Sequence, residues 1–178
     1  MPRKKHVKSE WLERSVAMTA AVLSVLLALT TIFGGIADGN STQYLVQSTD
    51  QWAFYQAKSI KGNLYDADRL MLETEKNNTA NTASYNSALD VRISDFKSKV
   101  DTYNKEKADI QTEAQRLEKL SASEGNKASV YNYANAFYQI AIILSAIALL
   151  IKKKYMWLAG VVLGLIGIGF SVFAYCMV

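Results

Sequence analysis

The side chains that carry most nucleophilic, redox and metal chemistry are scarce in this chain. It holds one cysteine, Cys176, and one histidine, His6. An intramolecular disulfide and a thiolate metal cluster are therefore impossible, and the usual nucleophile–base pairs have almost no residues to form from. Cys176 reads most simply as a small apolar residue, with palmitoylation or an intermolecular disulfide as alternatives. We expect a protein that is not an enzyme and that uses no cofactor and no metal.

Two polar residues, Asn135 and Ser145, lie inside an apolar segment. An amide in lipid is costly unless it is paired, so such a residue is a functional candidate by default. We favour a hydrogen bond across a helix interface for Asn135, and a place in a pore or ligand site is the alternative. The apolar segments contain no Asp, Glu, Arg or Lys, which argues against a proton-coupled transporter or a charge-selective filter.

Three segments without a charged residue run for 23, 24 and 24 residues: Ser15–Ala37, Ala128–Ile151 and Tyr155–Val178. The hydrocarbon core of a bilayer, about 30 Å thick, is crossed by roughly 20 helical residues. We therefore predict transmembrane helices at 15–37, 128–151 and 155–178. The first segment is longer than the apolar region of a secretory signal, so we interpret it as an uncleaved anchor.

Basic residues beside the spans predict the orientation. The tail at 1–14 carries Arg3, Lys4, Lys5, Lys8 and Arg14, and the turn at 152–154 is Lys152–Lys154. Short basic segments stay on the cytoplasmic side, and three spans place the tail and this turn on the same side. We expect both in the cytoplasm and residues 38–127 in the periplasm or cell exterior. The basic residues are explained as topology signals, so we expect the lipid bilayer and not nucleic acid as a partner.

A repeating seam of apolar residues begins in the polar segment 38–127, which has 12 Lys or Arg against 14 Asp or Glu. The spacing alternates between four and three, which is typical of a left-handed coiled coil. Lys107 interrupts the seam, and the same count continues through Asn135 and Ser145 to Leu149. We predict one nearly continuous helix from about Ser84 to Ile151. The seam residues in the polar segment are Leu89, Ile93, Phe96, Val100, Tyr103, Ile110, Ala114 and Leu117.

A second helix is predicted from Tyr44 to Glu75, before a polar turn at 76–84. We expect its apolar stripe to face the seam. The fold class is thus an all-α membrane protein with three transmembrane helices and an extramembrane antiparallel helical hairpin, a coiled coil, at 38–127. The stripe consists of Ala53, Ala57, Ile60, Leu64, Ala67 and Met71.

Small residues form faces on the first and third spans. Span association in lipid depends on close packing, which small residues permit. We favour packing among the spans of one chain, with homo-oligomerisation as the alternative. The small residues are Ala17, Ala21, Ser24, Ala28, Thr31 and Gly35 on the first span, and Gly160, Gly164, Gly167 and Gly169 on the third.

The aromatic and basic cluster at 50–61 has the order Asp-Gln-Trp-x-x-Tyr-Gln-Ala-Lys-Ser-Ile-Lys. By composition it suits an interfacial anchor or a helix-packing face. This motif, with one span before it and two after the charged segment, resembles a family of bacterial membrane proteins known only as a domain of unknown function, the DUF4337 type. The resemblance implies three spans in a bacterial inner membrane and implies no activity or catalytic residue.

Two functions fit these features. The first is a non-enzymatic structural or interaction protein, a homo-oligomer that presents a coiled-coil stalk outside the inner membrane. The alternative is an oligomeric ion channel or holin-like pore, lined by the small-residue face of the first span or by Asn135 and Ser145.

Overall fold

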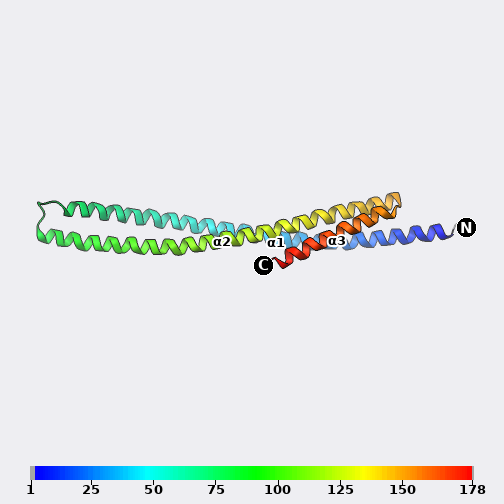
Figure 1. The fold of residues 1–178 in the computed structure, drawn as a ribbon, viewed down its shortest axis with the longest axis horizontal. Coiled ribbons are helices and arrows are strands. Elements are labelled where there is room, and N and C mark those ends of the chain that lie inside the picture. The colour runs from blue at the N-terminus through cyan, green and yellow to red at the C-terminus, as the bar shows by residue number, and fades with distance from the viewer. Residues whose placement is uncertain (1–2, 178) are drawn as a thin grey trace. The chain divides into compact units, whose positions relative to one another are not determined.

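Three helices and no strand make up the described part of the chain. The computed structural model describes the backbone of residues 3–177 and the side chains of residues 10–177. The helices are α1 (Arg3–Lys76), α2 (Ala83–Ile151) and α3 (Lys154–Cys176) (Figure 1). The all-helical class is confirmed, and α2 has almost the predicted bounds. The side chains of the predicted tail before Glu10, and the last residue of the third span, Val178, lie outside the described residues.

Helix α1 is longer than the sequence pattern suggested. The first span and the helix at 44–75 were expected as separate elements, yet α1 continues without a break through Gly34, Gly35 and Gly39. Proline, the residue that most strongly breaks a helix, does not occur in α1, and a glycine costs only about 1 kcal/mol relative to alanine. Glycine alone therefore marks no helix end here.

Two short connections join the helices. Residues 77–82 link α1 to α2, and the Thr82 side chain caps α2 by accepting a hydrogen bond from the Tyr85 backbone N–H at 3.3 Å. The connection from α2 to α3 consists of Lys152 and Lys153 alone. Lys152 has a φ of 55°, the left-handed conformation that ends many helices and that more often belongs to glycine. The left-handed conformation of Lys152 lets the chain reverse its direction over the two residues between α2 and α3.

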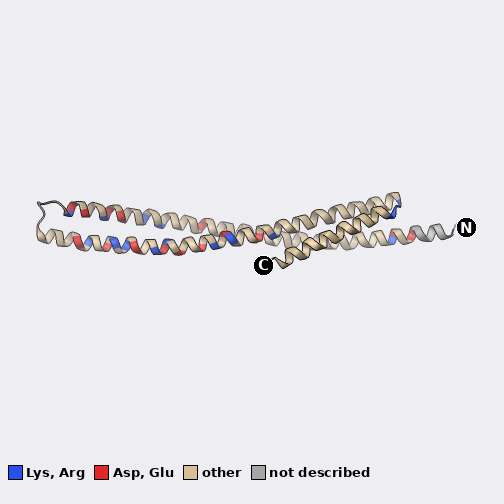
Figure 2. Cartoon of the chain, in the orientation of Figure 1, with Lys and Arg blue, Asp and Glu red and all other residues tan. Residues whose placement is uncertain are grey.

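The chain divides into two compact units. The apolar unit comprises the described residues up to Thr42 and those from Ser121 onward, and the charged unit comprises Gln43–Leu120. Lys, Arg, Asp and Glu gather on the charged unit, whereas the helices of the apolar unit carry them only near segment ends (Figure 2). All three helices include a stretch long and apolar enough to cross a membrane, which indicates a multi-pass membrane protein.

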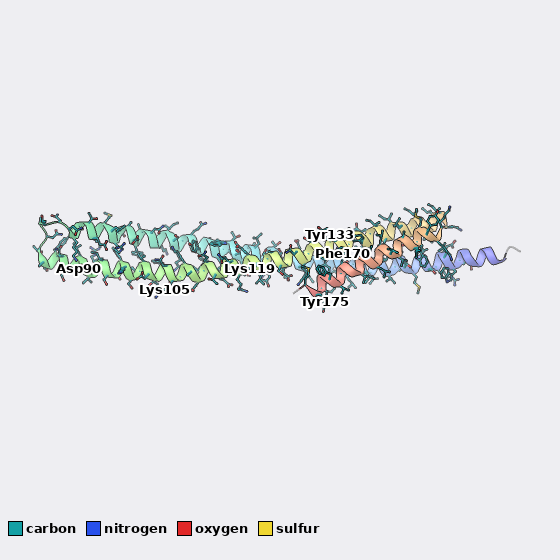
Figure 3. The ribbon with its side chains drawn as sticks, viewed as in Figure 1. Asp90, Lys105, Lys119, Tyr133, Phe170 and Tyr175 are labelled. Atoms are coloured by element: carbon teal, nitrogen blue, oxygen red, sulfur yellow. The ribbon has the colours of Figure 1, made fainter. Side chains whose placement is uncertain are left out.

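The core of the apolar unit is small and consists mainly of α2 residues. Leu23 of α1 packs with Ala134, Tyr138 and Ala141 of α2, and Leu163 and Phe170 of α3 lie against this cluster. Figure 3 shows Tyr133 and Phe170 side by side, with ring centroids 6.3 Å apart. Helix α2 therefore contacts both other helices in this unit.

In the charged unit, α1 and α2 run antiparallel, because residues later in α1 contact residues earlier in α2. Ser48 donates a hydrogen bond to the Ala114 carbonyl, Lys58 pairs with Glu106, and Lys76 pairs with Asp90. The predicted α2 seam is the covered face: Leu89, Ala114 and Leu117 are buried, and Ile93, Phe96, Val100, Tyr103 and Ile110 are half-buried.

The predicted α1 stripe does not face this seam. Ile60, Leu64 and Met71 are 70%, 61% and 70% exposed, and Ala53, Ala57 and Ala67 are exposed as well. A different series with the same alternating spacing is covered instead, and it lies two residues, about 200°, away around the helix. Its members are Tyr44, Ser48, Gln51, Tyr55, Lys58, Gly62, Tyr65, Arg69, Leu72 and Lys76.

Candidate functional site

The two polar residues of the second span have different surroundings. Asn135 is half-buried, and its Oδ1 accepts a hydrogen bond from the Thr30 hydroxyl of α1. Ser145 is fully buried, and its hydroxyl donates to the Ala141 carbonyl of its own helix at 2.8 Å. Asn135 therefore links two helices, whereas Ser145 is satisfied locally.

Hydroxyl groups make two further links between helices of the apolar unit. Tyr138 and Ser171 lie 3.0 Å apart, oxygen to oxygen, and join α2 to α3. Trp157 of α3 donates to the Thr19 hydroxyl of α1 at 3.1 Å. Sequence reasoning missed Thr19, Thr30 and Ser171 as partners, because serine and threonine within a span usually bond to their own helix and give no sign of a neighbour.

Three glycines on α3 allow it to approach the other two helices closely. A Cβ added to Gly160 would lie 3.0 Å from the Ala141 carbonyl oxygen of α2. One added to Gly164 would lie 2.7 Å from Leu23 of α1, and one added to Gly167 would lie 2.8 Å from Tyr138. Gly160 and Gly164 thus have close neighbours in other helices of the same chain. This arrangement corresponds to packing among the spans of one chain, the first of the two interpretations of this face. Gly169 has open space around its Cβ position.

The small-residue face of the first span has no neighbour within the described chain. Ala17, Ala21, Ser24 and Ala28 are exposed, and a Cβ at Gly35 would meet nothing within 4 Å. The α1 residues that face inward include Val16, Leu23, Thr30 and Gly34. Cys176 is exposed near the end of α3. In this chain, therefore, the α1 face and not the α3 face is free for lipid or for another copy.

Small residues also bring α1 and α2 together at the edge of the apolar unit. Ser41 donates to the Ser121 carbonyl, and Ser121 donates back to the Ser41 carbonyl, each at 2.8 Å. A Cβ at Gly125 would lie 3.1 Å from the Ser41 hydroxyl oxygen. Glycine at this position therefore makes room for a reciprocal pair of hydrogen bonds.

Aromatic rings and lysines fill the contact between α1 and α2 in the charged unit. The rings of Tyr65 and Tyr103 stack with centroids 5.8 Å apart, and Phe96 lies 5.5 Å from Tyr65. Lys58 and Lys99 each place Nζ 5.2 Å from a tyrosine ring centroid, within the range of cation–π attraction. A Cβ on Gly62 would lie 3.5 Å from the Tyr103 Cβ, an ordinary van der Waals distance, so Gly62 packs directly against Tyr103.

Lys107, the residue that interrupts the seam, joins this arrangement. Its Nζ lies 5.7 Å from the centroid of the Tyr55 ring, and the side chain is half-buried. A lysine in a seam can bury its apolar stem while its charge stays near water. The interruption therefore does not break the contact.

Ion pairs and hydrogen bonds shift the pKa values of several side chains in the charged unit. The Glu106 carboxylate, 2.6 Å from Lys58 Nζ, raises the pKa of Lys58 through their hydrogen bond. Arg116 donates two hydrogen bonds to Glu113 and lowers the pKa of that carboxyl. The Glu75 carboxylate accepts the hydroxyl proton of Tyr85 and raises the pKa of that phenol. These groups sit at the surface, so the pairs orient side chains more than they stabilise the fold.

The motif at 50–61 is divided between two faces of α1. Trp52 donates from Nε1 to Glu118 of α2 at 2.7 Å and lies edge-on to Tyr55, with ring centroids 5.5 Å apart. Phe54 and Ile60 point away from these contacts and are exposed. Among the residues with described positions, no group of three or more His, Cys, Asp or Glu could hold a metal ion.

A comparison with protein families assigns the chain. The model of the DUF4337 family, described as a domain of unknown function, matches residues 12–177. No curated protein and no solved structure matches the chain. The match begins just before the first apolar segment and ends just beyond α3, so it takes in both the apolar and the charged unit. The chain belongs to the DUF4337 family.

Proposed function

We propose that this protein is a non-enzymatic membrane scaffold: a homo-oligomer that presents an antiparallel helical hairpin, a coiled-coil stalk, on one side of a bacterial inner membrane. The observation that carries the proposal is the α2 seam. Its residues are buried both in the charged unit, at Leu89 and Leu117, and in the apolar unit, at Tyr131 and Tyr138. The polar members of the seam bond to side chains or to the backbone, which suits a structural role.

The proposed orientation places the connection at 77–82 outside the cytoplasm and Lys152–Lys154 inside it. The basic groups beside the spans support this, because they follow the positive-inside rule. At the same end, Trp11 and Trp157 lie edge-on with centroids 6.2 Å apart, and Lys152 pairs with Glu13 at 3.2 Å. Tryptophan beside lysine is typical of a membrane interface.

Thiol labelling tests the orientation. In a Cys176→Ser background, Asn78→Cys should react with a membrane-impermeant reagent in intact spheroplasts, and Lys153→Cys should react only after the membrane is opened. Both positions are exposed, so accessibility in the protein does not favour either one. Labelling at Lys153 and not at Asn78 would reverse the orientation.

The mass of the detergent-solubilised particle tests the oligomer. A scaffold of several copies predicts a particle of at least two chains at protein concentrations near those in the membrane. A monomer under conditions that preserve the helical signal would overturn the oligomeric part of the proposal.

An oligomeric pore is the second candidate, favoured by the exposed Ala, Ser and Thr face of α1. In a ring of copies that face could line a channel, whereas Asn135 is engaged by Thr30 within the chain. Purified protein in liposomes tests this candidate. Reproducible single-channel currents abolished by Ser24→Leu would replace the scaffold proposal, and liposomes that stay tight would exclude the pore.

A further inference from the structure

The charged unit exposes an apolar stripe on α1 that its own chain leaves uncovered. We call Ala53, Ala57, Ile60, Leu64, Ala67 and Met71 the outer stripe. Its three large members are 61% to 70% exposed. The helix around it carries charges on nearly every turn, among them Lys58, Asp66 and Arg69, so this stretch of α1 cannot lie in lipid. An apolar stripe in water calls for a partner.

Helix α2 shows what an ordinary solvent-facing position looks like in this unit. The α2 positions two residues beyond the seam correspond to the outer stripe on α1, and all of them are exposed. Val91 is the one apolar residue among them, and the others are polar: Asp95, Ser98, Thr102, Lys105, Asp109, Thr112, Arg116 and Lys119. Lys105 marks this polar side of α2 in Figure 3. The outer stripe is thus a special property of α1.

The spacing of the outer stripe specifies what kind of partner covers it. Its intervals alternate between four and three residues, so each pair of successive intervals spans seven residues, a period of 3.5. A stripe with that period stays in line with a second helix over many turns, whereas a period of 3.6 suits a single helix lying against a broad surface. The partner is therefore a helix that runs beside α1 for several turns.

A second copy of this chain can lie in parallel along the stripe without repulsion between like charges. In a parallel pair of identical helices, the residue before one stripe position faces the residue five places later in the other copy. This register sets Gln56 against Lys61 and Asn63 against Asp68. An amide can accept from a lysine and donate to a carboxylate, and no like charges meet. Copies anchored in one membrane with the same orientation also have parallel α1 helices.

We infer that the outer stripe of α1 pairs in parallel register with the outer stripe of a second copy of this chain. Ile60, Leu64 and Met71 then form the large layers of the pair, and the alanines let the two helices approach between them. This inference rests on the proposed function and names the contact that forms the oligomer.

Disulfide trapping in native membranes tests the pairing. In the Cys176→Ser background, Ile60→Cys and Met71→Cys should each cross-link to themselves, because parallel register places equal positions opposite each other. The matched control is Val91→Cys on α2, since Val91 and Ile60 are equally exposed at 70%. Val91→Cys should give only background dimer. Equal yields at Ile60 and Val91 would reflect random collision and overturn the inference.

Co-expressed copies that differ in tag size test the direction of pairing. If Ile60→Cys in one copy cross-links only to Met71→Cys in the other, the helices are antiparallel, Lys61 faces Asp68, and the parallel pair is wrong. Particle mass gives a second readout. Ile60→Glu with Leu64→Glu should separate the pair while helical content stays the same, and Val91→Glu should change neither.

The outcomes separate this inference from the proposed function. An oligomeric particle whose mass survives Ile60→Glu with Leu64→Glu, and in which Ile60→Cys does not cross-link, overturns the inference and leaves the scaffold standing. Its contact would then lie elsewhere, for example on the free face of the first span. A monomeric particle with unaltered residues overturns the oligomeric scaffold itself, and the inference with it.

Discussion

The same pair of helices is held together differently in the two units. In the apolar unit α1 and α2 meet through small residues and hydroxyls: Gly34 lies against Tyr131, Thr30 bonds to Asn135, and Ser41 and Ser121 bond to each other. In the charged unit they meet through rings and charged side chains, as in Tyr65 against Tyr103 and Lys58 against Glu106.

The difference follows from the solvent around each unit. Between helices in lipid there is no hydrophobic gain, so association depends on close approach and on interhelical hydrogen bonds. In water, burying an aromatic ring is strongly favourable, and lysines can lie over the rings with their charges still solvated. The α2 seam therefore keeps the same alternating spacing of four and three in both units, while the residue types on it differ between the apolar and the charged unit.

Placing a charge on the buried α2 seam of the charged unit should have the largest effect on stability. Leu117 is buried in the charged unit, and Leu117→Asp would bury an unpaired charge at a cost of about 3 kcal/mol or more. Thermal unfolding followed by the fluorescence of Trp52, with Trp11 and Trp157 replaced by Phe, measures it in this unit. The exposed control Thr102→Asp should leave the transition almost unchanged. Equal losses would mean that the seam does not hold the helices together.

Overfilling the apolar unit should come next. Gly160→Leu forces a side chain against the Ala141 backbone, which cannot rotate away, and overpacking of this kind costs about 1–3 kcal/mol. Gly169→Leu, with open space at its Cβ, is the matched control. Thermal stability of the solubilised protein should fall for the first variant alone. A normal melting temperature with a smaller particle would instead mean that Gly160 packs between copies.

Removing the Asn135 amide should have a smaller effect. Asn135→Leu keeps the volume and deletes the contact with Thr30, whose hydroxyl still has the Leu26 carbonyl of its own helix 2.9 Å away. Interhelical hydrogen bonds of membrane proteins average about 0.6 kcal/mol, so we expect a loss of that order in thermal stability. Ser24→Ala on the exposed face of α1 is the control. A more stable Asn135→Leu variant would indicate that the amide is kept for another purpose.

The smallest effect should be that of pH on the charged unit. The pKa of Glu113 is lowered in the folded chain, so its pairing with Arg116 stabilises above the usual glutamate pKa and is lost as pH falls through the folded value. The pKa of Lys58 is raised, so its pairing with Glu106 is lost only as strongly alkaline pH passes the folded value. Trp52 fluorescence during thermal unfolding measures both changes.

A matched variant separates the acidic change from general acid unfolding. Glu113→Gln should be less sensitive than the parent as pH falls below about 4.3, the usual glutamate pKa, and unaltered on the alkaline side. An identical acid response would remove the Glu113 pair from this account.

Helices α2 and α3, the three apolar stretches and the covered face of α2 could be predicted from the amino-acid sequence. Each follows from a local property: the absence of charge over more than twenty residues, the lack of proline, and an apolar series that has no competing series on the same helix. The resemblance to the DUF4337 family, stated from the motif and the layout, was confirmed over residues 12–177.

The face of α1 that meets α2 could not be predicted from the sequence. Two series on α1 share one period, and the more apolar of them, with Ile60 and Leu64, was predicted to be covered and is exposed. The period of an apolar series shows that a helix has an apolar face, but it does not show whether another helix packs against that face. Tyr55, Gly62 and Tyr65 are covered because they fit the rings and lysines of α2, and that fit is defined only when both helices are present.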